Sequence, residues 1–205
     1  SPVYVDTAKK VIVEVNTTQP LGLVGMADIY MRKNPPHCEP IPILHAGDRI
    51  GKPYIKCDPS KIVAIVPCDM PDVTRALAPL DDDAEAMGNN LVEFLTNEVK
   101  HGRLPENLLP LQSGVGNVAN AVIHGLVESQ FKNLSVYTEV IQDGMFELID
   151  KDKIDMISGT SLSPSPEGLK RFYDNIEKYN KKIVLRPQEI SNNGEVVRRI
   201  GVIGM

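Results

Sequence analysis

Glu139 is the residue whose type and position suggest chemistry most directly. It lies within residues 136–144 (VYTEVIQDG), where β-branched residues predict a strand that runs into the acid and then into a helix. Its carboxylate would therefore project from the carboxyl end of a strand, where open α/β sheets bind their ligands. A carboxylate in such a place could act as a nucleophile.

Residues 113–121 (SGVGNVANA) precede this run by the length of a short helix, and they predict a strand, a glycine turn and the start of a helix. The first N–H groups of a helix have no partner within the helix, so they can bind a negatively charged group. We therefore expect a nucleophilic acid and an anion-binding turn at the same edge of one sheet.

Simpler interpretations of these residues stay open at this point. An isolated acid after a strand is most often a solvated loop residue, or one that the helix dipole stabilises. The turn formed by Gly114, Val115 and Gly116 does not complete a dinucleotide-binding fingerprint and could be only a tight turn. Asn192 could be only the neighbour of a helix N-cap, because Ser191 and Asn192 precede a helical pattern.

The elements that must position these residues alternate along the second part of the chain. Apolar residues at helical spacing predict a helix over 84–99. Strands are then predicted at 108–112, 134–140, 154–158 and 183–186. Helical patterns alternate with them at 117–128, 144–151, 167–179 and 194–200. Such repeated βα units predict an α/β fold, in which a parallel sheet is flanked by helices.

The first part of the chain is less regular. Residues 11–15 and 62–66 are short β-branched runs that predict strands, and the prolines between them disfavour a helix. Residues 69–83 contain Pro71, Pro79 and an acidic triplet without periodicity, which indicates a linker between domains.

Composition argues against several classes of partner. The 205 residues are 42% hydrophobic, which is ordinary for a packed core. The net charge of -5 and the lack of a basic cluster interleaved with aromatic residues predict that nucleic acid is not a partner. No apolar run approaches the roughly 20 residues that span a bilayer, so no membrane association is expected either.

The cysteines and histidines give no pattern typical of a metal site. Cys38, Cys57 and Cys68 are far apart and lack the paired spacing of metal ligands, so we expect free thiols. His37 next to Cys38 could supply ligands only if others were spaced to join them, and none is. We expect the remaining histidines to lie on the surface or in the core; they are His45, His101 and His124.

Several segments closely resemble, in the same order, those of the acetyl-CoA hydrolase/transferase family, the class I CoA-transferases. They are residues 61–66 (KIVAIV), 102–114 (GRLPENLLPLQSG), 137–144 (YTEVIQDG), 185–193 (LRPQEISNN) and 198–203 (RRIGVI). The resemblance implies that residues 1–72 end an N-terminal CoA-transferase domain, that 73–83 form the linker, and that 84–205 begin the C-terminal domain with the catalytic glutamate. It also implies an incomplete fold, because family members continue on both sides of this segment.

The resemblance implies a covalent mechanism in which Glu139 attacks an acyl-CoA and becomes a glutamyl-CoA thioester. It places an oxyanion donor in the glycine turn, and we choose Val115 N–H within that turn because the glycines on either side let the backbone present this group. It assigns Asn192 to the acyl-CoA, and the Asn192 amide could donate to the acyl carbonyl or orient Glu139. Gly114, Gly116 and Asn117 complete the expected oxyanion and substrate-binding set. Gly194 stands where family members often carry proline, which is a local departure from the pattern.

Three functions remain in competition. The first is transfer of CoA between short carboxylic acids such as acetate and succinate, with coenzyme A as a substrate and no permanently bound cofactor. The second is hydrolysis of acetyl-CoA, in which water resolves the acyl-enzyme. The third is a noncatalytic CoA-binding or assembly role. The resemblance further implies a homodimer located in the cytoplasm, or in mitochondria if the source is eukaryotic.

Overall fold

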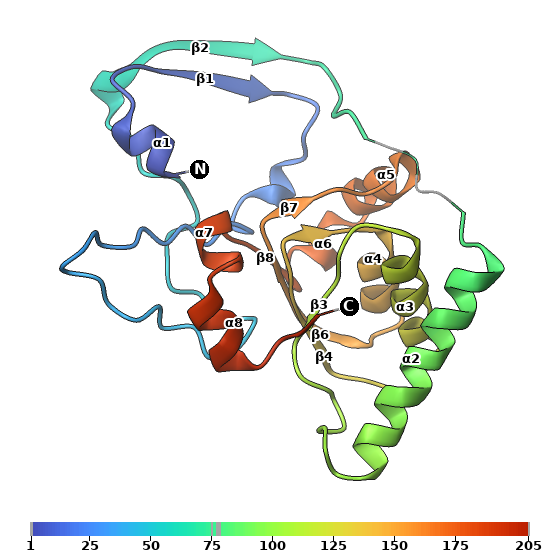
Figure 1. The fold of residues 1–205 in the computed structure, drawn as a ribbon. Coiled ribbons are helices and arrows are strands. Elements are labelled where there is room, and N and C mark those ends of the chain that lie inside the picture. Colours follow the sequence, from blue (N-terminus) through green and yellow to red (C-terminus); the bar gives the residue numbers. More distant parts are fainter. Residues whose placement is uncertain (1, 75, 77–78, 205) are drawn as a thin grey trace.

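A five-stranded parallel sheet organises the second part of the chain in the computed structural model, which describes residues 2–74, 76 and 79–204 (Figure 1). The strands are β3 (Leu111–Gln112), β4 (Leu134–Tyr137), β6 (Ile154–Gly159), β8 (Ile183–Leu185) and β9 (Ile203–Gly204). Their order across the sheet is β8, β6, β4, β3, β9, and every neighbouring pair is parallel. The α/β fold predicted from the repeated βα units is confirmed.

Helices flank this sheet, and most of them enclose the main core. They are α2 (Asp82–Lys100), α3 (Asn117–Glu128), α4 (Asp143–Asp150), α5 (Pro166–Asp174), α6 (Ile176–Tyr179), α7 (Gln188–Ser191) and α8 (Gly194–Ile200). Buried strand residues such as Leu134 and Ile157 share one apolar cluster with Leu126 of α3 and Phe146 of α4. The helices start where local chemistry favours it; for example, the Asp81 carboxylate accepts a hydrogen bond from the N–H of Ala84 at the start of α2.

Three predicted elements are shorter or interrupted in the structure. The strand expected over 108–112 is only β3, because Leu108 adopts a φ of 57° and Pro110 has no N–H to donate. The strand expected over 134–140 breaks after Tyr137, and β5 (Val140–Ile141) pairs instead with β7 (Ser161–Leu162). The helix expected over 167–179 is divided at Asn175, whose φ of -122° is not helical.

The first part of the chain forms a separate pair of strands. Its elements are α1 (Pro2–Thr7), β1 (Val11–Asn16), the short 3-10 helices η1 (Leu21–Leu23) and η2 (Pro59–Lys61), and β2 (Ile62–Cys68). As predicted, both β-branched runs are strands; they pair in parallel and lie apart from the five-stranded sheet (Figure 1). Ile12 and Ile65 are exposed on this pair.

The segment between β1 and β2 packs against the second part of the chain. Ala27 forms a parallel bridge with Leu185, so the chain near residue 27 continues the five-stranded sheet beyond β8. Further along, Ile41 and Ile43 are buried in a second apolar cluster with Tyr137 and Ile190. The division into domains at 1–72 and 84–205 stays a prediction, and residues 75, 77 and 78 of the expected linker at 73–83 lie outside the described residues.

A buried ion pair connects the segment between β1 and β2 to the five-stranded sheet. The Arg186 guanidinium follows β8 and forms a salt bridge with the Asp28 carboxylate, and both side chains are at most 2% exposed. Arg186 also donates to Ser158 Oγ at 2.7 Å and to the carbonyl of Ala46 at 3.0 Å. Burial lowers the pKa of Arg186, and the Asp28 carboxylate opposes that change. The two parts of the chain therefore share one desolvated charge network.

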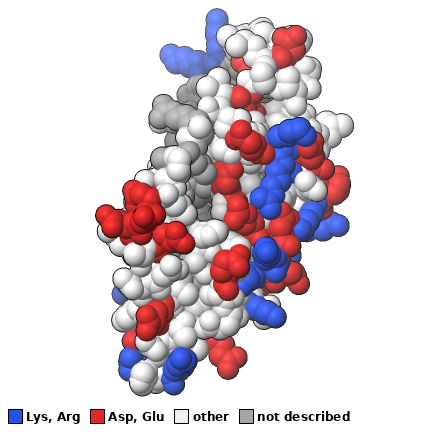
Figure 2. All heavy atoms as spheres, turned by 90° about the vertical axis from the view of Figure 1, so that its right-hand side faces the viewer, with Lys and Arg blue, Asp and Glu red and all other residues white. Residues whose placement is uncertain are grey.

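Figure 2 shows the face that lies at the right-hand side of Figure 1. Basic side chains on this face lie beside acidic ones, and one group of acidic side chains stands apart. No extended basic patch is visible on this face, which is consistent with the overall charge of -5. The expectation that nucleic acid is not a partner stays a prediction.

Replacing Asp28 by alanine should destabilise the protein by about 3–5 kcal/mol, because it leaves the buried Arg186 charge uncompensated. Urea unfolding would measure this loss. The matched control is Asp174→Ala, which removes an exposed salt bridge to Lys170 and should cost only about 0–1 kcal/mol. Equal losses in the two variants would contradict the role of the buried pair.

Gly116 precedes α3 with φ 149° and ψ 170°, a backbone conformation that is essentially restricted to glycine. Nothing lies within 4 Å of the position that a Cβ would occupy there, so Gly116→Ala should cost about 1–3 kcal/mol through backbone strain alone. Gly194→Ala is the control, because Gly194 is equally unobstructed but begins a helix without a positive φ. Urea unfolding should show a loss for the first variant and none for the second; an unchanged Gly116→Ala protein would refute the strain.

Candidate active site

Glu139 lies where the chain leaves the five-stranded sheet. The strand before it, β4, is central in that sheet, and the last bond of its ladder runs from Thr138 N–H to the carbonyl of Ser158 at 2.9 Å. The Glu139 carbonyl then accepts from the N–H groups of Thr160 and Ser161 at 2.8 and 3.1 Å. The main chain of Glu139 is therefore held on β6 and its extension, at the carboxyl end of β4 as the sequence predicted.

Two side-chain amides hold the Glu139 carboxylate. Gln188 Nε2 donates to Oε1 and Asn192 Nδ2 donates to Oε2, each at 3.0 Å. Neither donor is charged, and no salt bridge reaches Glu139 within the described part of the chain. Such bonds orient a carboxylate while leaving oxygen lone pairs free, because each carboxylate oxygen has about two acceptor sites.

The short helix α7 brings both amides to one side of Glu139. Gln188 is its first residue and Asn192 is its C-cap, so the two are four residues apart and lie on the same face. Tyr137 Oη donates to the carbonyl of Ile190 at 2.7 Å and thereby ties α7 to the end of β4. Burial raises the pKa of Tyr137 to about 12, so its hydroxyl remains a donor at neutral pH.

Sequence reasoning singled out Asn192 but missed Gln188. The structure shows that Asn193, and not Asn192, caps α8, because Asn193 Oδ1 accepts from the N–H groups of Glu195 and Val196. Asn192 is thus free to contact Glu139. The spacing of Gln188 and Asn192 could have indicated a shared helical face, but a helix of four residues is too short to be recognised from periodicity.

The glycine turn follows β3, the strand beside β4. Val115 is 72% exposed, and its N–H makes no hydrogen bond to any other residue that the structure describes. Gly116 precedes α3, and its carbonyl accepts from the N–H of Asn120. The turn therefore presents a free backbone donor just before a helix, and its role in binding an oxyanion stays a prediction.

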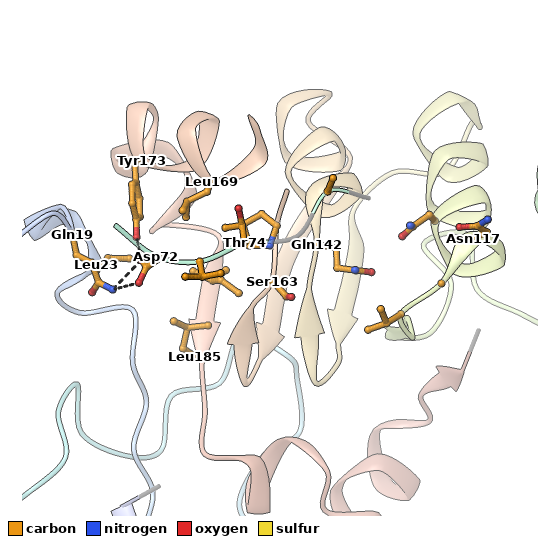
Figure 3. Close-up of a pocket in the computed structure, with 17 residues that line it drawn as sticks. Gln19, Leu23, Asp72, Thr74, Asn117, Gln142, Ser163, Leu169, Tyr173 and Leu185 are labelled. Carbon is orange, nitrogen blue, oxygen red and sulfur yellow. Dashed lines mark hydrogen bonds between the residues drawn. The ribbon is translucent and has the colours of Figure 1, made fainter. Parts of the chain in front are cut away.

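Two cavities separate the predicted residues into two groups. Glu139 and Asn192 line a cavity of about 260 Å³ together with Tyr137, Thr138 and Ser191. Another cavity, of about 800 Å³, is lined at one end by Val115, Gly116 and Asn117. Figure 3 shows this second cavity extending from Asn117 past Gln142 and Ser163 to Tyr173 and Asp72. Gly114 lines neither of these two cavities.

The structure thus brings Glu139 and Asn192 into direct contact, whereas Val115 does not contact Glu139 through any hydrogen bond. The link between the two groups is indirect. Thr138 Oγ1 donates to the carbonyl of Ser113 at 3.0 Å, directly before the glycine turn. Glu139 follows Thr138 in the sequence and Gly114 follows Ser113, so this bond joins the residues directly before each group.

Over 2–74, 76 and 79–204, no group of three or more histidine, cysteine, aspartate or glutamate side chains could hold a metal ion. Cys38, Cys57 and Cys68 are free thiols. None of the helices within these ranges combines the length and the apolar character needed to cross a bilayer.

Curated proteins resemble the chain along nearly its whole length. It is 59% identical over 202 residues to succinyl-CoA:acetate CoA-transferase of Clostridium kluyveri. The matched residues make up 98% of this chain and 38% of that protein. It is 49% identical over 205 residues to acetyl-CoA hydrolase of Schizosaccharomyces pombe, covering 100% of this chain and 39% of that protein. The chain thus spans about two fifths of the length of these relatives. No protein-family model matches.

Solved structures share the fold. RipA from Yersinia pestis has a TM-score of 0.66 at 17% identity, over 99% of this chain and 39% of that one. The 4-hydroxybutyrate CoA-transferase from Porphyromonas gingivalis has a TM-score of 0.54 at 24% identity, over 71% of this chain and 35% of that one. The structural likeness supports the fold alone, while the sequence identity to curated proteins is far higher. Over its own length, the chain is therefore similar in sequence to curated CoA-transferases and acetyl-CoA hydrolases.

Proposed function

We propose that this chain carries the nucleophile of an acyl-CoA:carboxylate CoA-transferase of the acetate and succinate type, acting through a glutamyl-CoA thioester on Glu139. The observation that carries the proposal is the Glu139 carboxylate, oriented by two neutral amides at the carboxyl end of a central parallel strand. The relative at 59% identity is a succinyl-CoA:acetate CoA-transferase, which supports the same assignment.

The reaction begins when a Glu139 oxygen attacks the carbonyl carbon of the acyl-CoA thioester. A C–O bond forms and the C–S bond breaks. CoA leaves as a thiolate, and a mixed anhydride between Glu139 and the acyl group remains on the protein. The thiolate then attacks the Glu139 carbonyl carbon, which forms the glutamyl-CoA thioester and releases the first acid as its carboxylate. The second carboxylate reverses these two steps and departs as the new acyl-CoA. Covalent catalysis divides one difficult exchange into easier ones.

A carboxylate suits this exchange better than a hydroxyl would. Its acyl derivative is an anhydride, which is activated at least as strongly as a thioester, so the intermediate does not become a thermodynamic trap. A serine would give an ester that CoA could reverse less readily. The amides of Gln188 and Asn192 would keep the carboxylate in a reactive orientation through each of these steps.

The glycine turn would stabilise the oxyanion. In each tetrahedral intermediate, Val115 N–H would donate to the negatively charged oxygen, and the loss of one such donor typically costs about 2.7–4 kcal/mol of barrier. Gly114 and Gly116 would let the main chain present this N–H, and Asn117 would add the first helical N–H group. The cavity of about 800 Å³ beside the turn would hold part of the CoA, while the cavity of about 260 Å³ at Glu139 suits a short acyl group.

The homodimer implied by the family resemblance belongs to the same proposal. Its test is the mass of the protein in solution by sedimentation equilibrium. A value of twice the chain mass supports the dimer, and a monomeric mass at assay concentrations contradicts it.

Replacing Glu139 by glutamine should abolish exchange of isotope-labelled acetate into acetyl-CoA by the protein that carries this chain, because the amide is a far weaker nucleophile. The matched control is Glu177→Gln, which changes an exposed acid of α6 and should leave exchange unchanged. Normal exchange by the Glu139→Gln variant would refute the assignment.

Hydrolysis is the second candidate, because the relatives at 45–49% identity include acetyl-CoA hydrolases. The difference between the two reactions lies in whether water reaches the acyl-enzyme. For a transferase, added succinate should convert acetyl-CoA to succinyl-CoA, with little free CoA formed in its absence. Rapid release of free CoA without any acid, unchanged by succinate, would instead identify a hydrolase.

A further inference from the structure

The two residues before Glu139 send their hydroxyl groups to opposite sides of the site. In an extended chain, successive side chains point in opposite directions. Tyr137 Oη accordingly reaches α7, where it donates to the Ile190 carbonyl at 2.7 Å. Thr138 Oγ1 reaches the end of β3, where it donates to the Ser113 carbonyl at 3.0 Å. Glu139 follows directly, so its position is fixed relative to both neighbours.

The Thr138 bond lies in a fully buried place. Thr138 is 1% exposed, and Ser113 is also buried. No other described residue donates to the Ser113 carbonyl. The glycine turn begins at the next residue, so the bond fixes where the free N–H of Val115 lies relative to Glu139. A buried carbonyl that lost this donor would be left unsatisfied and would tend to rotate.

The Tyr137 bond acts on the other flank. Its ring is buried with Ile41, Ile43, Ile190 and Val196, so the hydroxyl has little freedom to find a different partner. The Ile190 carbonyl that it holds lies between Gln188 and Asn192, the two residues that donate to Glu139. The bond therefore sets the distance between α7 and the end of β4.

We propose that Tyr137 and Thr138 are positioning residues that together hold Glu139 between the amide donors of α7 and the oxyanion donor of the glycine turn. This inference rests on the proposed function of Glu139. Each hydroxyl donates its proton to a main-chain carbonyl, so neither donates to the reacting atoms. Their effect is geometric: a displacement of about 1 Å between a nucleophile and its target can slow a reaction by about a hundredfold.

The test measures kcat and KM for exchange of labelled acetate into acetyl-CoA, using the protein that carries this chain. Thr138→Val keeps the shape of the side chain and removes the donor, and Tyr137→Phe does the same on the other flank. We expect each to lower kcat by about tenfold, the effect of losing one hydrogen bond, with KM for acetyl-CoA little changed. Thr138→Ser restores the hydroxyl and should recover most of the loss.

Two control variants remove similar bonds far from Glu139. Thr96→Val removes a hydroxyl that donates to the Val92 carbonyl within α2, and Tyr179→Phe removes a hydroxyl that donates to Asp150. Both should lower stability by amounts similar to the test variants while leaving kcat unchanged. A purely structural role for Tyr137 and Thr138 predicts no difference in kcat between test and control variants.

The outcomes separate this inference from the proposed function. If the wild-type protein shows no exchange, or if Glu139→Gln exchanges normally, the proposed function fails and the inference fails with it. If Glu139 is required but Thr138→Val and Tyr137→Phe keep the wild-type kcat, only the positioning inference fails. A Thr138→Ser variant as slow as Thr138→Val would also overturn it. Should Thr138→Val fail to fold, Tyr137→Phe and Thr138→Ser decide.

Discussion

The parallel pairing of β4 with β3 and β6 is the constraint on which the site depends. It brings the carboxyl ends of three strands to one edge, so that the residues that follow them lie close together although they are distant in sequence. Ladder bonds fix the main chain up to Thr138, and the pairing then changes to β5 with β7. Glu139 lies between the two sheets, after β4 of the five-stranded sheet and directly before β5 of the two-stranded sheet.

A strand that ends in this way leaves its next side chain free of the sheet. The Glu139 carboxylate lies beyond the end of β4, where it accepts hydrogen bonds from the two amides of α7. The main chain of Glu139 is held in place, because its carbonyl accepts hydrogen bonds from the N–H groups of Thr160 and Ser161. This fixed main chain limits the orientations that the side chain can adopt. Sites built on the ends of fixed strands hold their geometry better than sites on free loops.

The segment that contains Asp28 supports this frame from beside β8. Its carboxylate compensates the buried Arg186 charge, and Arg186 directly precedes Pro187 and the start of α7. Burying two charges is costly, so the pair stabilises the protein only while both partners remain. The position of α7, and with it that of Gln188 and Asn192, thus depends on residues more than a hundred positions earlier in the chain.

Local sequence patterns were sufficient for much of this fold. The helix predicted over 117–128 coincides with α3, because its apolar face extends over several turns. The helix predicted over 194–200 coincides with α8, because Asn193 caps its start and Gly201 ends it. The pattern was insufficient where a single residue interrupts a run, as at Leu108 and Asn175, because backbone conformation at one position leaves no periodic signal.

The candidate site was only partly predictable for a related reason. Glu139 and Asn192 could be selected from the sequence, and the structure brings them into contact. Gln188 could not, because its role depends on a four-residue helix whose position is set by Tyr137 and Arg186. The salt bridge between Asp28 and Arg186 joins residues 158 positions apart, and no local pattern indicates such a pair.

The most direct test is to determine whether CoA becomes covalently bound to Glu139. The protein that carries this chain would be incubated with acetyl-CoA, treated with borohydride to reduce any glutamyl thioester, digested and mapped by mass spectrometry. We expect reduction of a carboxyl group at Glu139 and at no other acid. Reduction at a different residue, or none in a protein that still exchanges acetate, would contradict it.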